Sequence, residues 1–429
     1  MIEAKPHGLT TDEGETVLQR YRRVRRATEE LAEPLSPEDQ LLQSMADASP
    51  VKWHLAHTSW FFETFVLAGL PGERPPRADY ALVFNSYYDG VGPRIARDRR
   101  GLLSRPSLDE VRGFRREIDD RMAAWLDGDR IPVDRAALVE LGLNHEEQHQ
   151  ELILTDVKHG LHANPLAPVY RPEPAAADRS SAPAPALSWS SFDEHIAWIG
   201  ASGTGFSFDN EQPRHRVLVP AFQIASRLVT AGEYLAFIAD GGYRRPELWL
   251  SDGWAAARAA DWRAPLYWDD AGGAWQVYTL RGARAVDPAE PVCHLSQYEA
   301  DAFARWAGAR LPTEFEWEVA SAHRGADGAL AESGALHPQP ASSEVGPGPV
   351  QMFGDAWEWT QSAYVGYPGF HPAAGAVGEY NGKFMSGQLV LRGGSCATPR
   401  RHLRASYRNF FPPSARWQFS GVRLARDPR

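Results

Sequence analysis

The pentapeptide His145-Glu-Glu-Gln-His149 constrains this chain more than any other feature. The apolar residues of the segment 141–159 recur at helical spacing, so the segment is predicted to be a helix. Two histidines four residues apart lie on one face of a helix, about one turn apart, and can bind the same metal ion. The pair alone is equally compatible with one packed and one surface histidine.

A third ligand has to come from another helix, because metal sites in helical bundles are made by side chains on facing helices. The segment after Ser49-Pro50 begins with a capping residue and a proline, which predicts a helix start, and it carries His54 and His57. These two are three residues apart and cannot both point well at one ion. We favour His57 as the ligand, with His54 as a neighbouring polar or surface residue. His159 lies about 15 Å from His149 along a helix and is too distant.

The acidic residues Glu151 and Asp156 follow the histidine pair and could fix the tautomers of the ligands by hydrogen bonds to their outer ring nitrogens. The pentapeptide also fits the zinc-protease pattern H-E-x-x-H, with Glu146 as general base. The extended metzincin form fails, because Leu152 and Thr155 occupy the positions of its glycine and third histidine. A protease of the other type needs a downstream glutamate on a neighbouring helix, and the chain becomes a linker after residue 160.

Three segments of different character follow one another. Residues 1–162 read as several helices with start signals such as the capping box Ser107-Leu-Asp-Glu110, which predicts a helical bundle. Between 66 and 106 the helical pattern lapses into a long aromatic loop. Residues 163–187 are rich in Pro, Ala and Ser and are predicted to be a linker. Residues 188–429 show short strands, glycine turns and two helices, which indicates an irregular α+β domain.

Composition excludes several classes of protein. The net charge of −10 argues against nucleic acid as a main partner. No run of about 18 apolar residues is present, so no membrane partner is expected. An N-terminus without an apolar stretch and the presence of only two cysteines, Cys293 and Cys396, indicate a cytoplasmic protein. The oligomeric state stays open.

Six motifs resemble those of one enzyme family, the sulfoxide synthases of ergothioneine biosynthesis. The motifs cover both predicted domains: Ser49–His57, His145–Leu152, Arg310–Glu318, Asp355–Trp359, Leu391–Ser395 and Phe419–Leu424. The resemblance implies a DinB-like four-helix bundle followed by a domain of the formylglycine-generating-enzyme type, a variant of the C-type lectin fold. The lectin-like motifs alone are shared by several activities, and the combination with the histidines is the discriminating feature.

The same resemblance implies a chemistry. A non-heme iron(II) would be held by His57, His145 and His149. The enzyme would use O2 to join the sulfur of a thiol, either cysteine or γ-glutamylcysteine, to the imidazole of hercynine (N-α-trimethylhistidine) as a sulfoxide. Imidazole ligands suit iron and zinc alike, so the residues themselves do not choose the metal.

Further site residues come with the resemblance. Gln148 matches a residue that contacts hercynine, and Asn409, Phe410 and Phe411 lie where the family binds the trimethylammonium and carboxylate end. An aromatic ring beside a quaternary ammonium is physically reasonable because of cation–π attraction. Ordinary core packing is the alternative for Phe410 and Phe411.

The family also needs a tyrosine near the iron as a proton donor. Tyr87 and Tyr88 match the arrangement in which adjacent tyrosines of the bundle loop take this role, which favours cysteine as the sulfur donor; aromatic packing is the alternative. Arg94, Arg97 and Arg100 follow directly and could bind the carboxylate of the thiol substrate, since arginine binds carboxylates through two hydrogen bonds. Each could instead be a solvated side chain.

Three other functions compete with this interpretation. A DinB-type metal-dependent thiol transferase would use zinc or nickel and no O2. A formylglycine-generating activity needs paired active-site cysteines, and Cys293 and Cys396 lack the matching context. A lectin-like domain could also serve as a binding module without catalysis.

Overall fold

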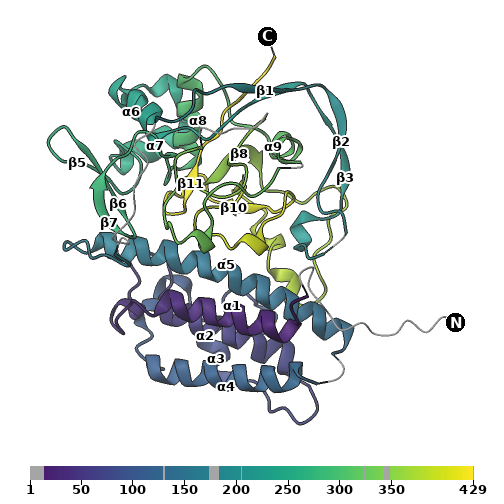
Figure 1. Cartoon of the computed structure of the whole chain (residues 1–429). Coiled ribbons are helices and arrows are strands. Elements are labelled where there is room, and N and C mark those ends of the chain that lie inside the picture. The colour runs from purple at the N-terminus through teal and green to yellow at the C-terminus, as the bar shows by residue number, and fades with distance from the viewer. Residues whose placement is uncertain are drawn as a thin grey trace. The chain divides into compact units, whose positions relative to one another are not determined.

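The computed structural model describes residues 14–128, 131–172, 183–203, 205–322, 324–342 and 348–428. The chain divides into two compact units, Met1–Gly160 and Leu161–Arg429 (Figure 1). The predicted domain limits at 162 and 188 stay a prediction, because residues 173–182 of the proposed linker lie outside the described residues.

The first unit is helical, as predicted. Its α-helices are α1 (Val17–Ala32), α2 (Val51–Phe61), α3 (Ala78–Phe84), α4 (Leu108–Leu126) and α5 (Val133–Ala163). Between them lie two short 3-10 helices, η1 (Asp39–Leu41) and η3 (Arg97–Leu102), and a π-helical segment, η2 (Phe62–Leu67), that continues α2. The capping box that opens α4 is confirmed: the Ser107 side chain accepts from the backbone of Glu110, whose carboxylate accepts in return.

Two predictions about the first unit are wrong in detail. The stretch 66–106 is not a continuous loop, since α3 forms within it. At the start of α2, Pro50 rather than Ser49 takes the capping position, and no side chain caps the helix. Ser49 is used elsewhere: its N–H donates to Asp156 and its hydroxyl accepts from Arg100.

Helices α2 and α5 approach closely at Gly142. A Cβ atom on Gly142 would lie only 2.7 Å from a ring carbon of Phe62 and 2.9 Å from one of Phe61. Glycine is therefore required at this position to admit both rings. Gly142 lies one turn before His145, so the contact that sets the separation of the two helices is adjacent to the histidines.

A buried ion-pair cluster joins α5 to α1 and α4. The carboxylate of Glu146 accepts from Arg25 at 2.8 Å, from Arg115 at 2.6 Å and from the Thr28 hydroxyl at 2.7 Å. Burial raises the pKa of a carboxyl group, but Arg115 and Arg25 outweigh it and lower the pKa of Glu146 to about 2. Arg25 is held in turn by Asp119 at 2.6 Å. Glu146 thus fixes three helices together.

The second unit is the sheet-rich α+β domain that was predicted. Its strands are β1 (Trp189–Phe192), β2 (His195–Ile199), β3 (His215–Val219), β4 (Phe222–Ala225), β5 (Trp268–Asp270), β6 (Trp275–Thr279), β7 (Gly282–Ala285), β8 (Trp357–Ala363), β9 (Leu389–Arg392), β10 (Asn409–Phe411), β11 (Ser420–Gly421) and β12 (Ala425–Arg426). They form small sheets in the orders β1-β4-β12, β10-β9-β8-β11, β2-β3 and β5-β6-β7. The helices are α6 (Ala231–Ala239), α7 (Ser251–Ala259), α8 (Gln297–Trp306) and α9 (Glu314–Ser321). Of these, α7 and α9 were not predicted.

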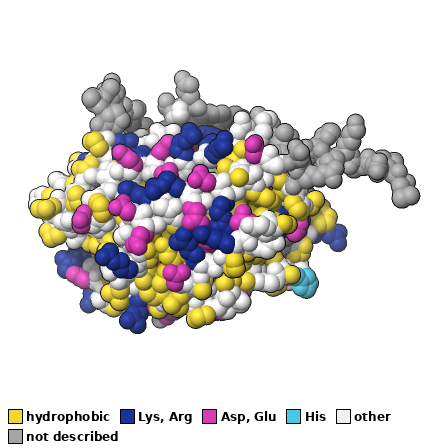
Figure 2. Space-filling view, turned by 90° about the horizontal axis from the view of Figure 1, so that it is seen from below, with side chains coloured by type: hydrophobic (Ala, Val, Ile, Leu, Met, Phe, Trp, Pro, Cys, Tyr) yellow, Lys and Arg dark blue, Asp and Glu magenta, His cyan; other side chains and the backbone are white. Residues whose placement is uncertain are grey.

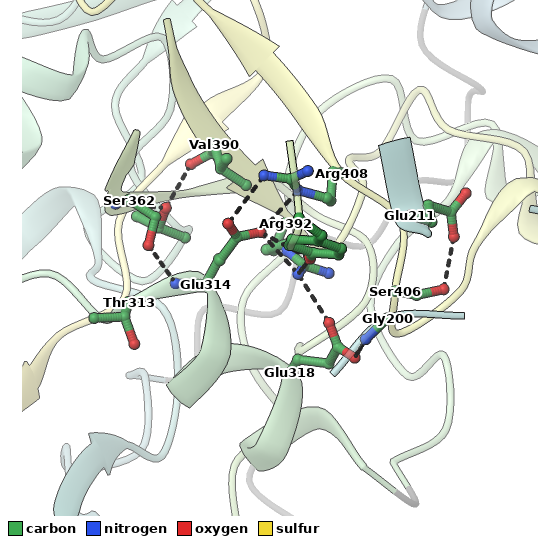
Figure 3. A network of polar contacts seen from close by, with 12 residues as sticks. Gly200, Glu211, Thr313, Glu314, Glu318, Ser362, Val390, Arg392, Ser406 and Arg408 are labelled. Carbon is green, nitrogen blue, oxygen red and sulfur yellow. Dashed lines mark hydrogen bonds and ion pairs between the residues drawn. The ribbon is translucent and has the colours of Figure 1, made fainter. Parts of the chain in front are cut away.

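A second buried network holds the start of β10 (Figure 3). The Glu314 carboxylate lies between Arg392, at 3.0 Å, and Arg408, at 2.9 Å, and Arg392 also pairs with Glu318 at 2.9 Å. Paired in this way, charges that would be costly to bury are compensated. Arg408 directly precedes Asn409, so the network fixes the backbone that presents the predicted hercynine residues.

The face of the molecule that Figure 2 shows carries side chains of both charges. Lys and Arg side chains alternate there with Asp and Glu, and apolar side chains lie between them. Among the described residues, no helix combines the length and apolar character needed to cross a bilayer.

Replacing Glu146 with alanine is expected to destabilise the protein by about 3–5 kcal/mol, because Arg25 and Arg115 would remain buried without their carboxylate. Glu140 on the same helix is the matched control, since its half-exposed side chain pairs with Arg20 at 3.5 Å and Glu140→Ala should cost less than about 1 kcal/mol. Urea unfolding of both variants measures the difference. Equal losses would show that Glu146 does not hold the bundle together.

Candidate metal centre

Three histidine side chains converge between α2 and α5. The Nε2 atom of His145 lies 3.2 Å from Nε2 of His57 and 3.1 Å from Nε2 of His149. All the candidate ligand atoms lie within 4.8 Å of one another, and no other group of three His, Cys, Asp or Glu side chains in the described ranges meets this condition. The structure therefore brings together the three predicted ligands.

The electrostatics of the centre suit a metal ion. Burial lowers the pKa of His145 to about 3 and, with the neighbouring His145, lowers the pKa values of His57 and His149 well below the usual range. All three rings are consequently neutral near pH 7. Neutral imidazole is the form that donates a lone pair to a metal, so the three residues fit a metal ion.

His57 is fixed by aromatic rings and by one backbone group. Its ring packs nearly parallel to Trp53, at 4.5 Å and 13°, and to Trp60, at 5.6 Å and 19°. Its Nδ1 lies 2.6 Å from the carbonyl oxygen of Phe84, the last residue of α3. Only a protonated Nδ1 can donate to a carbonyl, which leaves the lone pair of Nε2 directed at the centre.

His54 is not a surface residue. Its side chain is 1% exposed, and its Nδ1 lies 2.7 Å from Nδ1 of His149, while its Nε2 lies 3.1 Å from Asp156. Both ring nitrogens of His54 are engaged by these two contacts, which agrees with the expectation that His54 is not a metal ligand. Its burial went unrecognised because every residue of α2 is buried, so the helix has no polar face to mark the outside.

Glu146 cannot serve as the general base of a protease. Its carboxylate is held by Arg25 and Arg115 in the cluster described above. Asp156 contacts His54, and His54 contacts His149. The acidic residue predicted to orient a ligand is therefore present, but one side chain lies between it and His149.

The predicted tyrosines lie in the same unit. Tyr88 is fully buried, and its ring contacts Phe65 at 5.1 Å and Trp60 at 5.9 Å. Tyr87 is half-buried and packs against Tyr88 at 4.9 Å. Because Trp60 also packs on His57, Tyr88 is separated from a candidate ligand by one aromatic ring.

The predicted arginines fall into two groups. Arg94 and Arg97 are exposed, and Arg94 pairs with Asp89 at 3.0 Å. Arg100 is 3% exposed; its guanidinium donates to the hydroxyls of Ser49, at 2.8 Å, and Ser86, at 3.0 Å. It also lies over the Trp53 ring, with Cζ 3.5 Å from the ring centre. No pattern in the sequence distinguishes the buried arginine from the exposed ones.

The remaining predicted site residues are half-buried. Gln148 lies on α5 between the two histidines. Asn409, Phe410 and Phe411 form β10, in which alternate side chains point to opposite sides. The Phe410 ring stacks on Tyr364 at 4.0 Å and 11°, and Phe411 meets Trp417 edge-on at 5.9 Å.

Comparison with known proteins agrees with both units. Residues 20–153 match the DinB superfamily, and residues 198–345 and 332–428 match the sulfatase-modifying factor enzyme 1-like domain. The chain is 36% identical over 413 residues to a hercynine oxygenase of Mycolicibacterium thermoresistibile, covering 88% of this chain and 87% of that protein. The chain belongs to the ergothioneine-biosynthesis sulfoxide synthases.

Two more relatives differ in how much of this chain they match. A hercynine oxygenase of Mycobacterium tuberculosis is 34% identical over 88% of this chain and 91% of its own length. A formylglycine-generating enzyme of Streptomyces coelicolor is 30% identical but matches only 53% of this chain. Both relatives that cover 88% of this chain are hercynine oxygenases, whereas the formylglycine-generating enzyme matches about half of it.

Replacing His57 with alanine is expected to abolish metal retention during dialysis, because two ligands from one helix then remain. His159→Ala is the control, since His159 lies on α5 but pairs with the Ser44 hydroxyl at 2.7 Å rather than with the centre. Metal content by mass spectrometry, with circular dichroism to verify folding, measures the outcome. Wild-type metal content in a folded His57→Ala protein would remove His57 from the ligand set.

Proposed function

We propose that this enzyme is an iron(II)- and O2-dependent oxidoreductase that forms a sulfoxide from hercynine and a thiol, either cysteine or γ-glutamylcysteine. The reaction balances as hercynine plus thiol plus O2 giving the sulfoxide plus water. A C–H and an S–H bond break, a C–S and an S–O bond form, and O2 accepts four electrons. The observation that carries the proposal is a buried, neutral three-histidine centre in a chain that resembles hercynine oxygenases along nearly its whole length.

The metal would be held by His57, His145 and His149. When bound, iron(II) supplies the redox chemistry with O2. Three protein ligands leave room for substrates on a six-coordinate ion. The rings of Trp53 and Trp60 beside His57 exclude water from one side of the centre.

Arg100 is the arginine best suited to bind the carboxylate of the thiol. In the described residues it forms no ion pair, and its Nε atom is buried without a hydrogen-bond partner. Two hydroxyl groups orient the guanidinium but do not neutralise it. Asp156 attracts the guanidinium but does not contact it. A buried cation without a contacting carboxylate is costly, so an incoming carboxylate would gain a charge-assisted interaction here. Arg94 and Arg97, both exposed, could contribute to attraction of the anion.

Tyr87 and Tyr88 are the proposed proton donors, with the phenol Oη as the donating atom. The aromatic packing of Tyr88 holds its ring in place next to Trp60, and the Tyr87 ring packs against Tyr88. For hercynine, we propose that Gln148 contacts the imidazole end. Asn409, Phe410 and Phe411 would then bind the trimethylammonium and carboxylate end.

Anaerobic loading with Fe(II), followed by O2, hercynine and each thiol in turn, tests this function. The sulfoxide should appear by mass spectrometry only when iron, O2 and a thiol are all present. Absence of product with both thiols would contradict the proposal. Thiol consumption in a zinc-loaded or nickel-loaded protein without O2 would instead support a metal-dependent thiol transferase.

Removing the phenol hydroxyl of the proton donor should lower the rate of sulfoxide formation by at least about 100-fold, in line with the usual contribution of a general acid. We expect this of Tyr88→Phe or Tyr87→Phe, with iron affinity unchanged. Tyr80→Phe is the matched control, because Tyr80 is a buried tyrosine of α3 that packs on Phe84 and Phe114. Full activity in both single variants and in the double variant would exclude the two tyrosines as donors.

A further inference from the structure

A path of hydrogen-bonded side chains connects one candidate metal ligand, His149, to the carboxylate of Asp156. His149 Nδ1 lies 2.7 Å from His54 Nδ1, and His54 Nε2 lies 3.1 Å from Oδ2 of Asp156. The same Oδ2 atom accepts the backbone N–H of Ser49 at 2.8 Å. His54 is 1% exposed and Asp156 is 8% exposed, so water cannot readily take their places.

We propose that His54 and Asp156 are positioning residues: together they fix His149 as a ligand through Nε2 and increase its donor strength. This inference rests on the metal site of the proposed function. When Nε2 of a neutral His149 binds the metal, its proton must be on Nδ1. His54 then accepts at its own Nδ1, which requires that its proton be on Nε2. Asp156, as a carboxylate, accepts that proton's hydrogen bond and so selects the tautomer of both rings.

The three predicted ligands are therefore not equivalent. His57 donates to a neutral backbone carbonyl, that of Phe84. His149 donates to His54, which in turn donates to the negatively charged carboxylate of Asp156. A carboxylate behind an imidazole makes the imidazole more basic and a stronger donor to the metal than a carbonyl does. The bond from His149 should consequently depend on Asp156, although the two are seven residues apart and do not touch.

Asp156 is also connected, through Ser49, to Arg100, the residue proposed to bind the carboxylate of the thiol substrate. The Ser49 backbone N–H donates to Asp156, and the Ser49 hydroxyl accepts from Arg100 at 2.8 Å. Ser49 thus has two separable functions, one through its backbone toward the metal and one through its side chain toward Arg100. This separation allows the two effects to be distinguished by mutation.

The test measures metal affinity of the full-length protein by chelator competition with Fe(II) and Co(II), and the absorption spectrum of the Co(II) form. His54→Phe keeps a ring but cannot accept from His149, and it should weaken metal binding by about 10–100-fold and shift the Co(II) bands. Asp156→Asn should weaken binding less, because an amide oxygen can still accept. His54→Gln should recover part of the loss, since its amide can accept from His149 and donate to Asp156.

Two controls separate positioning from mere folding. His159→Phe replaces a histidine of the same helix that pairs with Ser44 and should leave both the affinity and the Co(II) spectrum unchanged. Ser49→Ala keeps the backbone N–H and should leave the metal affinity unchanged while raising the KM for the thiol. If His54→Phe does not fold, His54→Gln and Asp156→Asn decide the question through the same measurements.

Metal affinity and Co(II) spectra within threefold of the wild type in the folded variants would overturn the proposal. So would equal losses in His54→Phe and His54→Gln, because these would indicate packing alone. The readouts need no turnover, so this failure differs from failure of the proposed function. A wild-type protein that binds metal normally but forms no sulfoxide would contradict only the function.

Discussion

Burial of neutral imidazoles is the constraint on which the rest of the first unit depends. Three buried histidines that face one another have little reason to be close unless something binds between them, because each ring loses its hydration on burial. The close approach of α2 and α5 at Gly142 makes this proximity possible. The ion pairs of Glu146 on a different face of α5 then prevent the helix from turning to relieve it.

Helix α5 is consequently buried along most of its length, and each face has a different role. One face carries His145 and His149 toward α2, and another carries Glu146 toward α1 and α4. About two turns beyond His149, Asp156 pairs with His54. The apolar spacing within 141–159 was enough to predict the helix, but a helix buried in this way has no polar face that marks its outer side. The spacing of the two histidines was the signal for its function.

The sequence was sufficient to predict which three histidines come together and insufficient to predict what surrounds them. The i, i+4 spacing of His145 and His149 follows from helix geometry alone, and His57 followed from the choice between two histidines on a second helix. The contact between His54 and Asp156 depends on how two helices are placed side by side, 102 residues apart in the chain, and no local pattern encodes it. The same is true of α3, a seven-residue helix whose last carbonyl orients His57. In the second unit, the capping box that starts α6 at Thr230 is visible in the sequence, whereas the network around Glu314 joins residues that local patterns cannot connect.

Buried arginines offer a way to distinguish structural charges from those that await a ligand. Arg25 and Arg115 share Glu146, and in the second unit Arg392 and Arg408 share Glu314. In each pair the protein itself supplies the counter-charge, so the arginines serve the fold. Arg100 is buried to a similar extent, but in the described residues its guanidinium forms no ion pair: it donates to the hydroxyls of Ser49 and Ser86 and lies over the Trp53 ring. Asp156 attracts it only from beyond ion-pair distance. Folding would be better served by a carboxylate at that place or by an apolar side chain. A buried charge without a contacting carboxylate makes physical sense there when a substrate brings that carboxylate. Because Arg100 also stacks on the tryptophan that packs against His57, that carboxylate would arrive next to the metal ligands.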